Sequence, residues 1–355
     1  MFERFLWGHQ GWSRKAQLGA LVIVVSLFAA DAEASELLDL DLEQLSEVEV
    51  ALQNVTVMGG HTHTKGQWMV SASHMYMSME GTGSLSSEQV LADYPITPTS
   101  MSMQSTMLHM MYAPTDKITL AAMLPIRSLS MDHLTRMGGK FTTESSGLGD
   151  AHLSALVEVW GGEGPHGGAG HRLLGYGGMS LPTGSINEKG ETPLGVVKLP
   201  YPMQLGSGTV DPAIGVTYLG HRGNWGWGTH GMAKMRLYDN SNDYHLGQNL
   251  HLASWIGRGF SDWLSTTLTL DGKGWTNIVG ADTDLNPAMV ATADPSLRAG
   301  RRVDALISGD LFVPSGLMQG LRLTLAGGVP VYQHLTGPQL ETEWMASITL
   351  GYTRY

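Results

Sequence analysis

Cysteine is missing from this chain of 355 residues, and charged residues make up only 15% of it. Without cysteine there is no disulfide framework and no thiol-based active site. Soluble domains usually contain about 25% charged residues, so the low fraction argues against an ordinary soluble domain. The charges that are present sum to −11, and this acidic balance argues against nucleic acid as a partner.

Long apolar runs are also missing once the N-terminal region is set aside. No later segment reaches the roughly 18 consecutive apolar residues that indicate a transmembrane helix. Hydrophobic residues nevertheless make up 42% of the chain, and there are 46 glycines. This combination is typical of a β-rich chain in which apolar and polar residues alternate, so that a hydropathy average conceals the apolar face.

The N-terminal region has the pattern of a secretory signal peptide. Basic residues precede a largely apolar run at 18–30, which is too short to span a bilayer, and an A-x-A cleavage sequence ends at Ala34. We therefore expect residues 1–34 to be a signal peptide and residues 35–65 to be a periplasmic leader or plug with a short helix. Residues 66–355 would then form an outer-membrane β-barrel. A retained N-terminal anchor is the alternative.

About twelve segments after residue 65 alternate between apolar and polar residues. Each is long enough for a tilted membrane strand, which needs about 9–11 residues, and bacterial single-chain barrels have an even number of strands. The predicted segments are 66–79, 101–113, 117–129, 148–160, 169–181, 208–220, 225–238, 245–258, 261–274, 299–312, 319–332 and 342–355.

The lengths of the links between these segments also alternate. Short links follow the even-numbered segments, and most links after the odd-numbered segments are long. Short periplasmic turns and long outer loops are typical of a transmembrane barrel, whereas a soluble β-sandwich gives no reason for such sorting. We therefore predict an all-β protein, a transmembrane antiparallel β-barrel, that lies as a monomer in the lipid bilayer of the outer membrane.

Aromatic residues mark one boundary of the predicted membrane region. They lie at segment ends next to the short links, with the parity of the apolar face, and are Tyr112, Tyr218, Trp225, Trp227 and Tyr352. Tyrosine and tryptophan favour the membrane–water interface, so we expect these residues to form a girdle at the periplasmic side.

Methionine is the unusual residue, with 21 in the chain, and it gathers on one face of the first three segments. That face carries Met75, Met77, Met79, Met101, Met103, Met107, His109, Met111 and Met123, while His61 and His63 lie just before the first segment. If the opposite face meets lipid, adjacent strands carry a thioether-rich stripe along the wall of the lumen.

Two interpretations of this stripe remain open. Thioether sulfur is soft and suits Cu(I), and imidazole adds a nitrogen donor, so the stripe could bind a soft metal ion. Methionine also fills gaps and contacts apolar solutes, so the stripe could line a pore without any metal or other cofactor.

Charged residues on the inward parity raise a similar choice. They could form a salt-bridge network that stiffens the barrel, which we favour, or a selectivity ring. They are Lys234, Arg236, Arg302, Asp304, Asp310, Arg322 and Glu343.

Signs of an enzyme are weak. His152 and Ser154 share one face of their segment, but no third partner with a defining motif accompanies them, and no phosphate loop or HExxH sequence occurs. We therefore predict no enzymatic activity and keep an outer-membrane hydrolase as an alternative.

Several stretches resemble one family of outer-membrane proteins, the phenol meta-pathway degradation (MetA-pathway) transporter-like family. They are residues 101–127, 131–150, 181–184 and 336–342, and the likeness runs from about Gly59 to the C-terminus. The resemblance implies a channel or transporter for aromatic or other small apolar compounds, and it carries over no catalytic residue. The Met/His-rich half resembles a subgroup associated with copper, so copper handling is the alternative to transport of a small-molecule solute.

Overall fold

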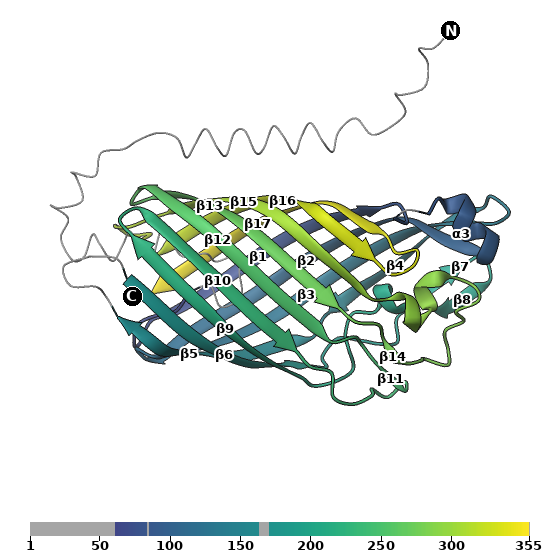
Figure 1. Ribbon diagram of the computed structural model, residues 1–355, viewed down its shortest axis with the longest axis horizontal. Helices are drawn as coiled ribbons and strands as arrows, with labels where there is room; N and C mark the ends of the chain where they lie inside the picture. Colours follow the sequence, from purple (N-terminus) through teal and green to yellow (C-terminus); the bar gives the residue numbers. More distant parts are fainter. Residues whose placement is uncertain (1–60, 84, 163–169, 355) are drawn as a thin grey trace, which may run out of the picture. The chain divides into compact units, whose positions relative to one another are not determined.

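The computed structural model describes residues 61–83, 85–162 and 170–354, in which twelve antiparallel strands close into a barrel (Figure 1). Each strand pairs with the next, and the last pairs with the first. The barrel strands are β1 (Trp68–Glu80), β2 (Ile96–Thr115), β3 (Ile118–Thr135), β5 (Ala151–Gly162), β6 (Gly170–Leu181), β9 (Asp211–Arg222), β10 (Trp225–Lys234), β12 (Asn249–Ser261), β13 (Leu264–Trp275), β15 (Gly300–Phe312), β16 (Leu321–Leu335) and β17 (Glu341–Arg354). The predicted fold class is confirmed. The predicted signal peptide and helical leader, up to residue 60, lie outside the described residues.

Closure satisfies the backbone, which is the condition for placing β-structure in lipid. The β1–β17 ladder runs from Trp68 opposite Arg354 to Glu80 opposite Glu341, so neither end of the sheet is left as a free edge. An unpaired backbone amide or carbonyl in hydrocarbon costs several kcal/mol, and only helices or closed barrels avoid that cost. Among the described residues, no helix combines the length and the apolar character needed to cross a bilayer.

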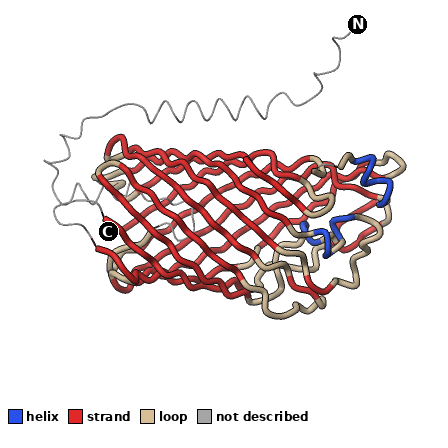
Figure 2. Tube along the Cα trace, in the orientation of Figure 1, coloured by secondary structure: helices blue, strands red, loops and turns tan. Residues whose placement is uncertain are grey.

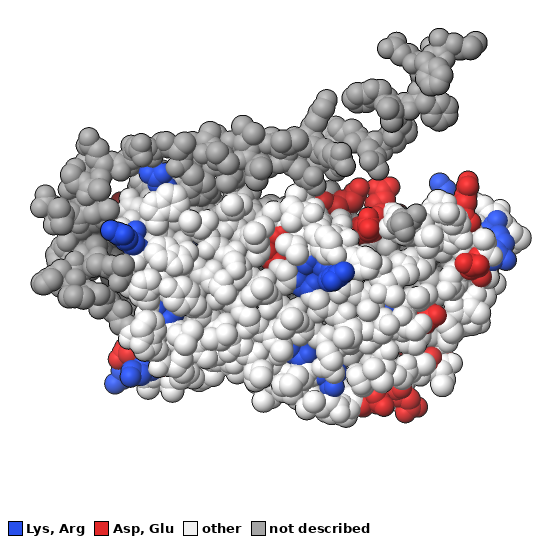
Figure 3. Space-filling model, viewed as in Figure 1, with Lys and Arg blue, Asp and Glu red and all other residues white. Residues whose placement is uncertain are grey.

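The two faces of the strands differ as the alternation predicts. On the outward face, Leu325 of β16 and Ile348 of β17 are 53% and 48% exposed, whereas Arg322 and Thr324 on the inward face of β16 are buried. Charged side chains are sparse over the strands in the visible face of Figure 3. An apolar outer surface around a polar interior is stable in lipid and not in water, and the protein is an outer-membrane barrel.

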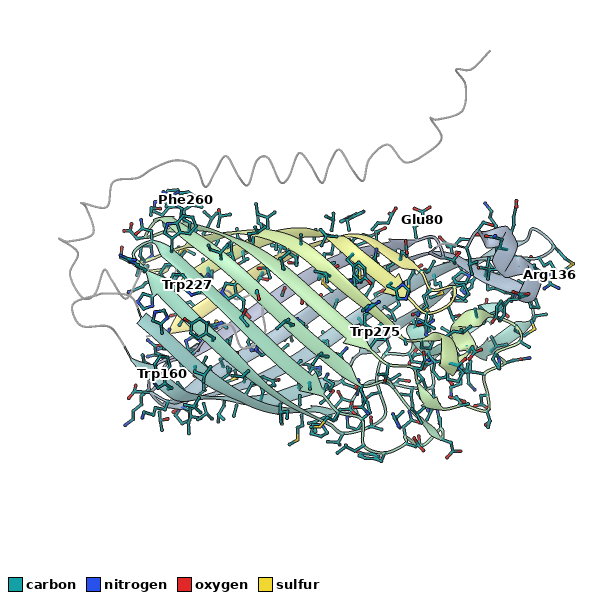
Figure 4. The ribbon with its side chains drawn as sticks, in the orientation of Figure 1. Glu80, Arg136, Trp160, Trp227, Phe260 and Trp275 are labelled. Atoms are coloured by element: carbon teal, nitrogen blue, oxygen red, sulfur yellow. The ribbon has the colours of Figure 1, made fainter. Side chains whose placement is uncertain are left out.

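Aromatic side chains ring the end of the barrel that carries the short links. The predicted girdle residues Tyr112, Tyr218, Trp225, Trp227 and Tyr352 all lie at that end of their strands. The Arg258 guanidinium lies 5.3 Å from the ring of Trp225 and 5.5 Å from that of Phe260. Trp160, Trp227 and Phe260 gather at the same end in Figure 4. Short links are typical of the periplasmic side of such barrels, so we assign this end, where β17 also finishes, to the periplasm.

The long links fold into short elements at the opposite end of the barrel (Figure 2). They are α3 (Ser87–Asp93), β4 (Lys140–Leu148), β7 (Lys189–Thr192), β8 (Gly195–Lys198), η2 (Tyr201–Met203), β11 (Tyr244–His245), β14 (Val279–Gly280), η3 (Ala291–Ala293) and η4 (Pro295–Leu297). The sequence predicted an irregular loop at 130–147. Instead β3 continues to Thr135 and pairs with β4, because Gly138 makes a turn with a φ of 83° and Phe141 begins a run that favours strands.

A charge placed on the outward face should destabilise the barrel far more than a charge in a turn. Ile348 lies in the middle of β17, opposite His74 of β1. We expect Ile348→Arg to lower the free energy of unfolding by about 2–4 kcal/mol, measured by denaturant titration in lipid vesicles. Leu317→Arg, in the exposed periplasmic turn, is the control and should change it little. Equal effects of the two substitutions would contradict the membrane position of this face.

Candidate functional site

The predicted methionines of β1 and β2 face each other in register across the inner wall. Three direct pairs form, Met69 with Met111, Met77 with Met103 and Met79 with Met101. Side chains directly opposite each other in antiparallel strands have Cβ atoms about 4.5–5.5 Å apart, so the thioethers of each pair are neighbours. The outward-facing exception, Met110, is 54% exposed. The stripe is therefore one continuous surface of the lumen, which we call the methionine wall.

Neighbouring strands extend the methionine wall on both sides. On β3, Met131 lies opposite Met101, and Met123 lies opposite His109. On β17, Met345 lies opposite Met77, and sequence reasoning missed it because only the closing β1–β17 register brings the two ends of the chain together.

The outer half of the methionine wall is packed beneath a loop. Leu199, Met203 and Leu205 fold into the mouth of the barrel and are nearly fully buried there. They form one hydrophobic cluster with Met101, Leu129 and Met131, and Met79, Met103 and Leu340 pack against it. In this half the methionines act as core residues, and the loop of residues 199–207 narrows the outer mouth.

Hydrogen bonds to buried groups hold this loop in place. The Asp150 carboxylate accepts bonds from the backbone amides of Gly184 and Ser207, at 3.0 and 2.8 Å, and from the Ser207 hydroxyl at 2.7 Å. Arg127 donates to the Leu205 carbonyl at 3.3 Å. A single carboxylate thus ties two outer segments to the start of β5.

The middle of the methionine wall is less covered. Met75 and Met107 point inward from β1 and β2 and are half-buried, whereas Met77 and Met111 beside them are buried. Serines face both of them across the β1–β2 pair, since Ser105 lies opposite Met75 and Ser73 lies opposite Met107. This stretch borders the interior of the barrel with thioethers and small hydroxyl groups.

At the periplasmic end, residues 61–65 lie against the inner wall. The His63 amide donates to the Thr119 hydroxyl at 3.1 Å, and Thr119 is itself buried on β3. Lys65 donates its amide to Asp116 at 2.8 Å. The rings of His61 and His63 are 5.3 Å apart and both are buried, so these histidines do not simply face solvent.

His63 is brought close to His109 by this arrangement. Burial, and next the nearby His109, lower the pKa of His63 to about 4, so its imidazole is neutral at pH 7. Its Nε2 atom has no hydrogen-bond partner in the structure. Within the described residues, no three His, Asp or Glu side chains form a group that could hold a metal ion, so a metal here would need thioether ligands.

Four of the predicted charged residues, on β15 and β16, form another sector of the lumen together with His251, Asp271 and Lys273 of β12 and β13, which were not predicted. Its ion pairs are Lys273–Asp271 at 2.6 Å, Arg302–Asp304 at 2.9 Å and Arg322–Asp310 at 3.3 Å, and His251 contacts Asp271 at 2.5 Å. Each buried carboxylate has a cationic neighbour, which favours stiffening over a ring of free charge. Of the other predicted members, Arg236 pairs with Asp211, and Glu343 accepts a bond from Ser78 at 3.4 Å.

The charged sector and the methionine wall meet at Thr342. Arg302 donates a hydrogen bond to the Thr342 hydroxyl, and that hydroxyl lies 3.8 Å from the sulfur of Met77. A guanidinium and a soft sulfur therefore contact the same hydroxyl group on the inner surface.

The hydrolase alternative finds no supporting geometry among the described residues. His152 and Ser154 both point inward from β5, and the nearest carboxylate along that strand is Asp150. Its oxygens are already bound by Gly184 and Ser207, so it does not orient the imidazole of His152 as a triad requires.

Comparison with known proteins agrees with the fold. The family described as "Putative MetA-pathway of phenol degradation" has a model that matches residues 107–299, more than half of the chain. No curated protein matches the chain.

Among solved structures, the COG4313 outer membrane channel from Pseudomonas putida F1 is 14% identical, with a TM-score of 0.59, over 82% of this chain and 97% of that one. The transport unit of the autotransporter AIDA-I from Escherichia coli is 10% identical, with a TM-score of 0.43, over 88% and 99%. The likeness to the COG4313 channel shows that the chain has the fold of an outer membrane channel.

Removing the Asp150 carboxylate should loosen the loop of residues 199–207. Hydrogen bonds to a charged group contribute about 1.5–3 kcal/mol each, so we expect Asp150→Asn to speed amide exchange in this loop about tenfold to hundredfold. Hydrogen–deuterium exchange with mass spectrometry measures the exchange rates of these amides. Asp262→Asn, in an exposed turn at the other end of the barrel, is the control. Unchanged exchange in Asp150→Asn would show that packing alone holds the loop.

Proposed function

The chain belongs to the MetA-pathway of phenol degradation family, and from that premise we propose that it is a monomeric outer-membrane channel or transporter for a small amphipathic aromatic solute. Export to the outer membrane is then the role of residues 1–34, which lie outside the described residues, and residues 66–355 are the transporting barrel. The chain has no enzymatic role in this proposal.

The observation that carries the proposal is the meeting of soft and charged groups at Thr342. Sulfur–aromatic contacts are favourable by about 0.3–1.5 kcal/mol, so the methionines beside Thr342 suit the ring of an aromatic solute. Arg302, bound to the same hydroxyl, suits a hydroxyl or carboxylate substituent on that ring. A solute with an aromatic ring and a polar substituent finds a favourable partner for each group on this surface. A sugar of similar size has no ring that contacts the sulfur atoms favourably.

Block of ion current through the reconstituted barrel tests this solute class. We expect 4-hydroxybenzoate to block the current in planar bilayers at concentrations at which glucose does not. The double substitution Met75→Ser with Met77→Ser should weaken this block about tenfold, since two sulfur–aromatic contacts are lost. Met110→Ser, on the outward face of β2, is the matched control and should leave the block unchanged.

Two results would contradict the proposal. A barrel that carries neither ion current nor solute would not be a channel. The methionines would not recognise the solute if glucose and 4-hydroxybenzoate blocked the current equally. The same would follow if the double substitution left the block unchanged.

A second candidate function is the handling of Cu(I). One observation favours it: at the periplasmic end, the methionine wall meets two histidines, the buried His63 and the half-buried His109, which supply nitrogen donors beside the thioethers.

A further inference from the structure

We infer that the periplasmic end of the methionine wall binds one monovalent soft cation, Cu(I) or the chemically similar Ag(I). His63, His109 and Met123 are the proposed ligands, and Met69 and Met111 lie beside them. The inference rests on the second proposed function, the handling of Cu(I), and the site is separate from the solute surface at Thr342.

The register of the strands brings these donors to one patch. His109 of β2 lies directly opposite Met123 of β3, so their side chains are neighbours on the inner wall. Met111 is the next inward residue of β2, about 7 Å further along the strand, and it faces Met69 of β1. Three strands thus contribute one imidazole and three thioethers to adjoining positions of the inner wall.

A fifth donor comes from outside the strands, in the segment that precedes β1. The hydrogen bond from the His63 amide to Thr119 fixes this residue over the inward face of β3. Thr119 has the same parity as Met123, and His109 is close enough to His63 to affect its charge. His63 therefore lies on the lumen side of the wall near His109, whereas the other donors come from the wall itself.

The orphaned nitrogen of His63 is the observation that packing does not explain. His63 is only 7% exposed, and its Nε2 atom has no hydrogen-bond partner. A buried nitrogen without a partner is unfavourable, and a bound cation would supply the missing partner. Met69 and Met111 also belong to a hydrophobic cluster with Leu156 and Leu174, which accounts for their burial but not for that of His63.

The chemistry of the donors selects the class of ion. Thioethers and imidazoles are soft or borderline ligands, which favour Cu(I) and Ag(I) over hard cations such as Mg²⁺ or Ca²⁺. Met69, Met111 and Met123 are all at least nine-tenths buried, so the patch is nearly dry. A monovalent ion that gives up its water for a few soft ligands fits such a place.

A competition titration under anaerobic conditions tests the site. The full-length barrel in detergent is titrated with Cu(I) supplied as its acetonitrile complex, against the chelator bicinchoninate. We expect one Cu(I) per barrel. Met123→Leu and His109→Gln should each weaken binding at least about tenfold, because loss of even an outer-shell group often costs 10- to 100-fold in metal affinity. X-ray absorption of the loaded protein should show both sulfur and nitrogen neighbours.

Two matched controls separate this site from methionine in general. Met131→Leu removes a buried thioether from the outer half of the wall, and Met110→Leu removes one from the lipid face. Both should bind Cu(I) as the unchanged protein does. Methionine-to-leucine changes conserve volume, and the shift in gel mobility on heating shows that each variant is folded.

The inference is overturned if less than one equivalent of Cu(I) binds, or if Met123→Leu and His109→Gln leave the affinity unchanged. Should the His109 variant not fold, Ag(I) titration of Met123→Leu decides the same question. Cu(I) binding and current block are measured separately, so either proposal can fail while the other holds.

Discussion

The continuous ladder between β1 and β17 is the interaction on which the rest of this structure depends. It turns a sheet with two free edges into a closed barrel, and lipid permits no other arrangement of strands, because each unpaired backbone group there costs several kcal/mol. Once the ladder is closed, every second residue must point inward. The direction of Met77, the burial of Arg322 and the exposure of Ile348 all follow from that one condition.

This dependence explains how much of the fold could be predicted from the sequence. Alternation is a local pattern, so Arg322, Thr324 and Leu325 reveal their faces within four residues, and each of the predicted segments overlaps a barrel strand. The alternation of short and long links likewise distinguishes the two ends of the barrel from the sequence alone. The strand pairing of β4 with β3 was missed, because it extends a barrel strand beyond the membrane, where the sequence no longer alternates as clearly.

The sequence predicted which way the side chains of the candidate site point, but not which residues surround each of them. Parity places Met101, Met75 and Met123 on the same inner face, yet each has different neighbours. Met101 is covered by Met203, which is about a hundred residues away in the chain and folds back through bonds centred on Asp150. Contacts of this kind depend on where a long loop finishes, and no periodic signal in the loop encodes it. The same is true of His63, whose place is set by a hydrogen bond to Thr119 rather than by a strand.

The methionine wall has three parts, and the methionines of each part have different neighbours. The same residue type therefore serves a different purpose in each part. Under the loop of residues 199–207, thioethers pack against leucine and contribute stability. In the middle they are half-buried beside serines and, through Met77 and Thr342, adjoin the guanidinium of Arg302. At the periplasmic end they stand beside imidazoles. The proposed cation at His109 lies one inward position along β2 from Met107, about 7 Å away. A bound cation would therefore place a positive charge at the periplasmic exit of the proposed solute surface, where it would attract an aromatic acid and repel an aromatic amine. On this argument the two proposed functions share one wall, and the occupancy of one site would bias which solutes pass the other.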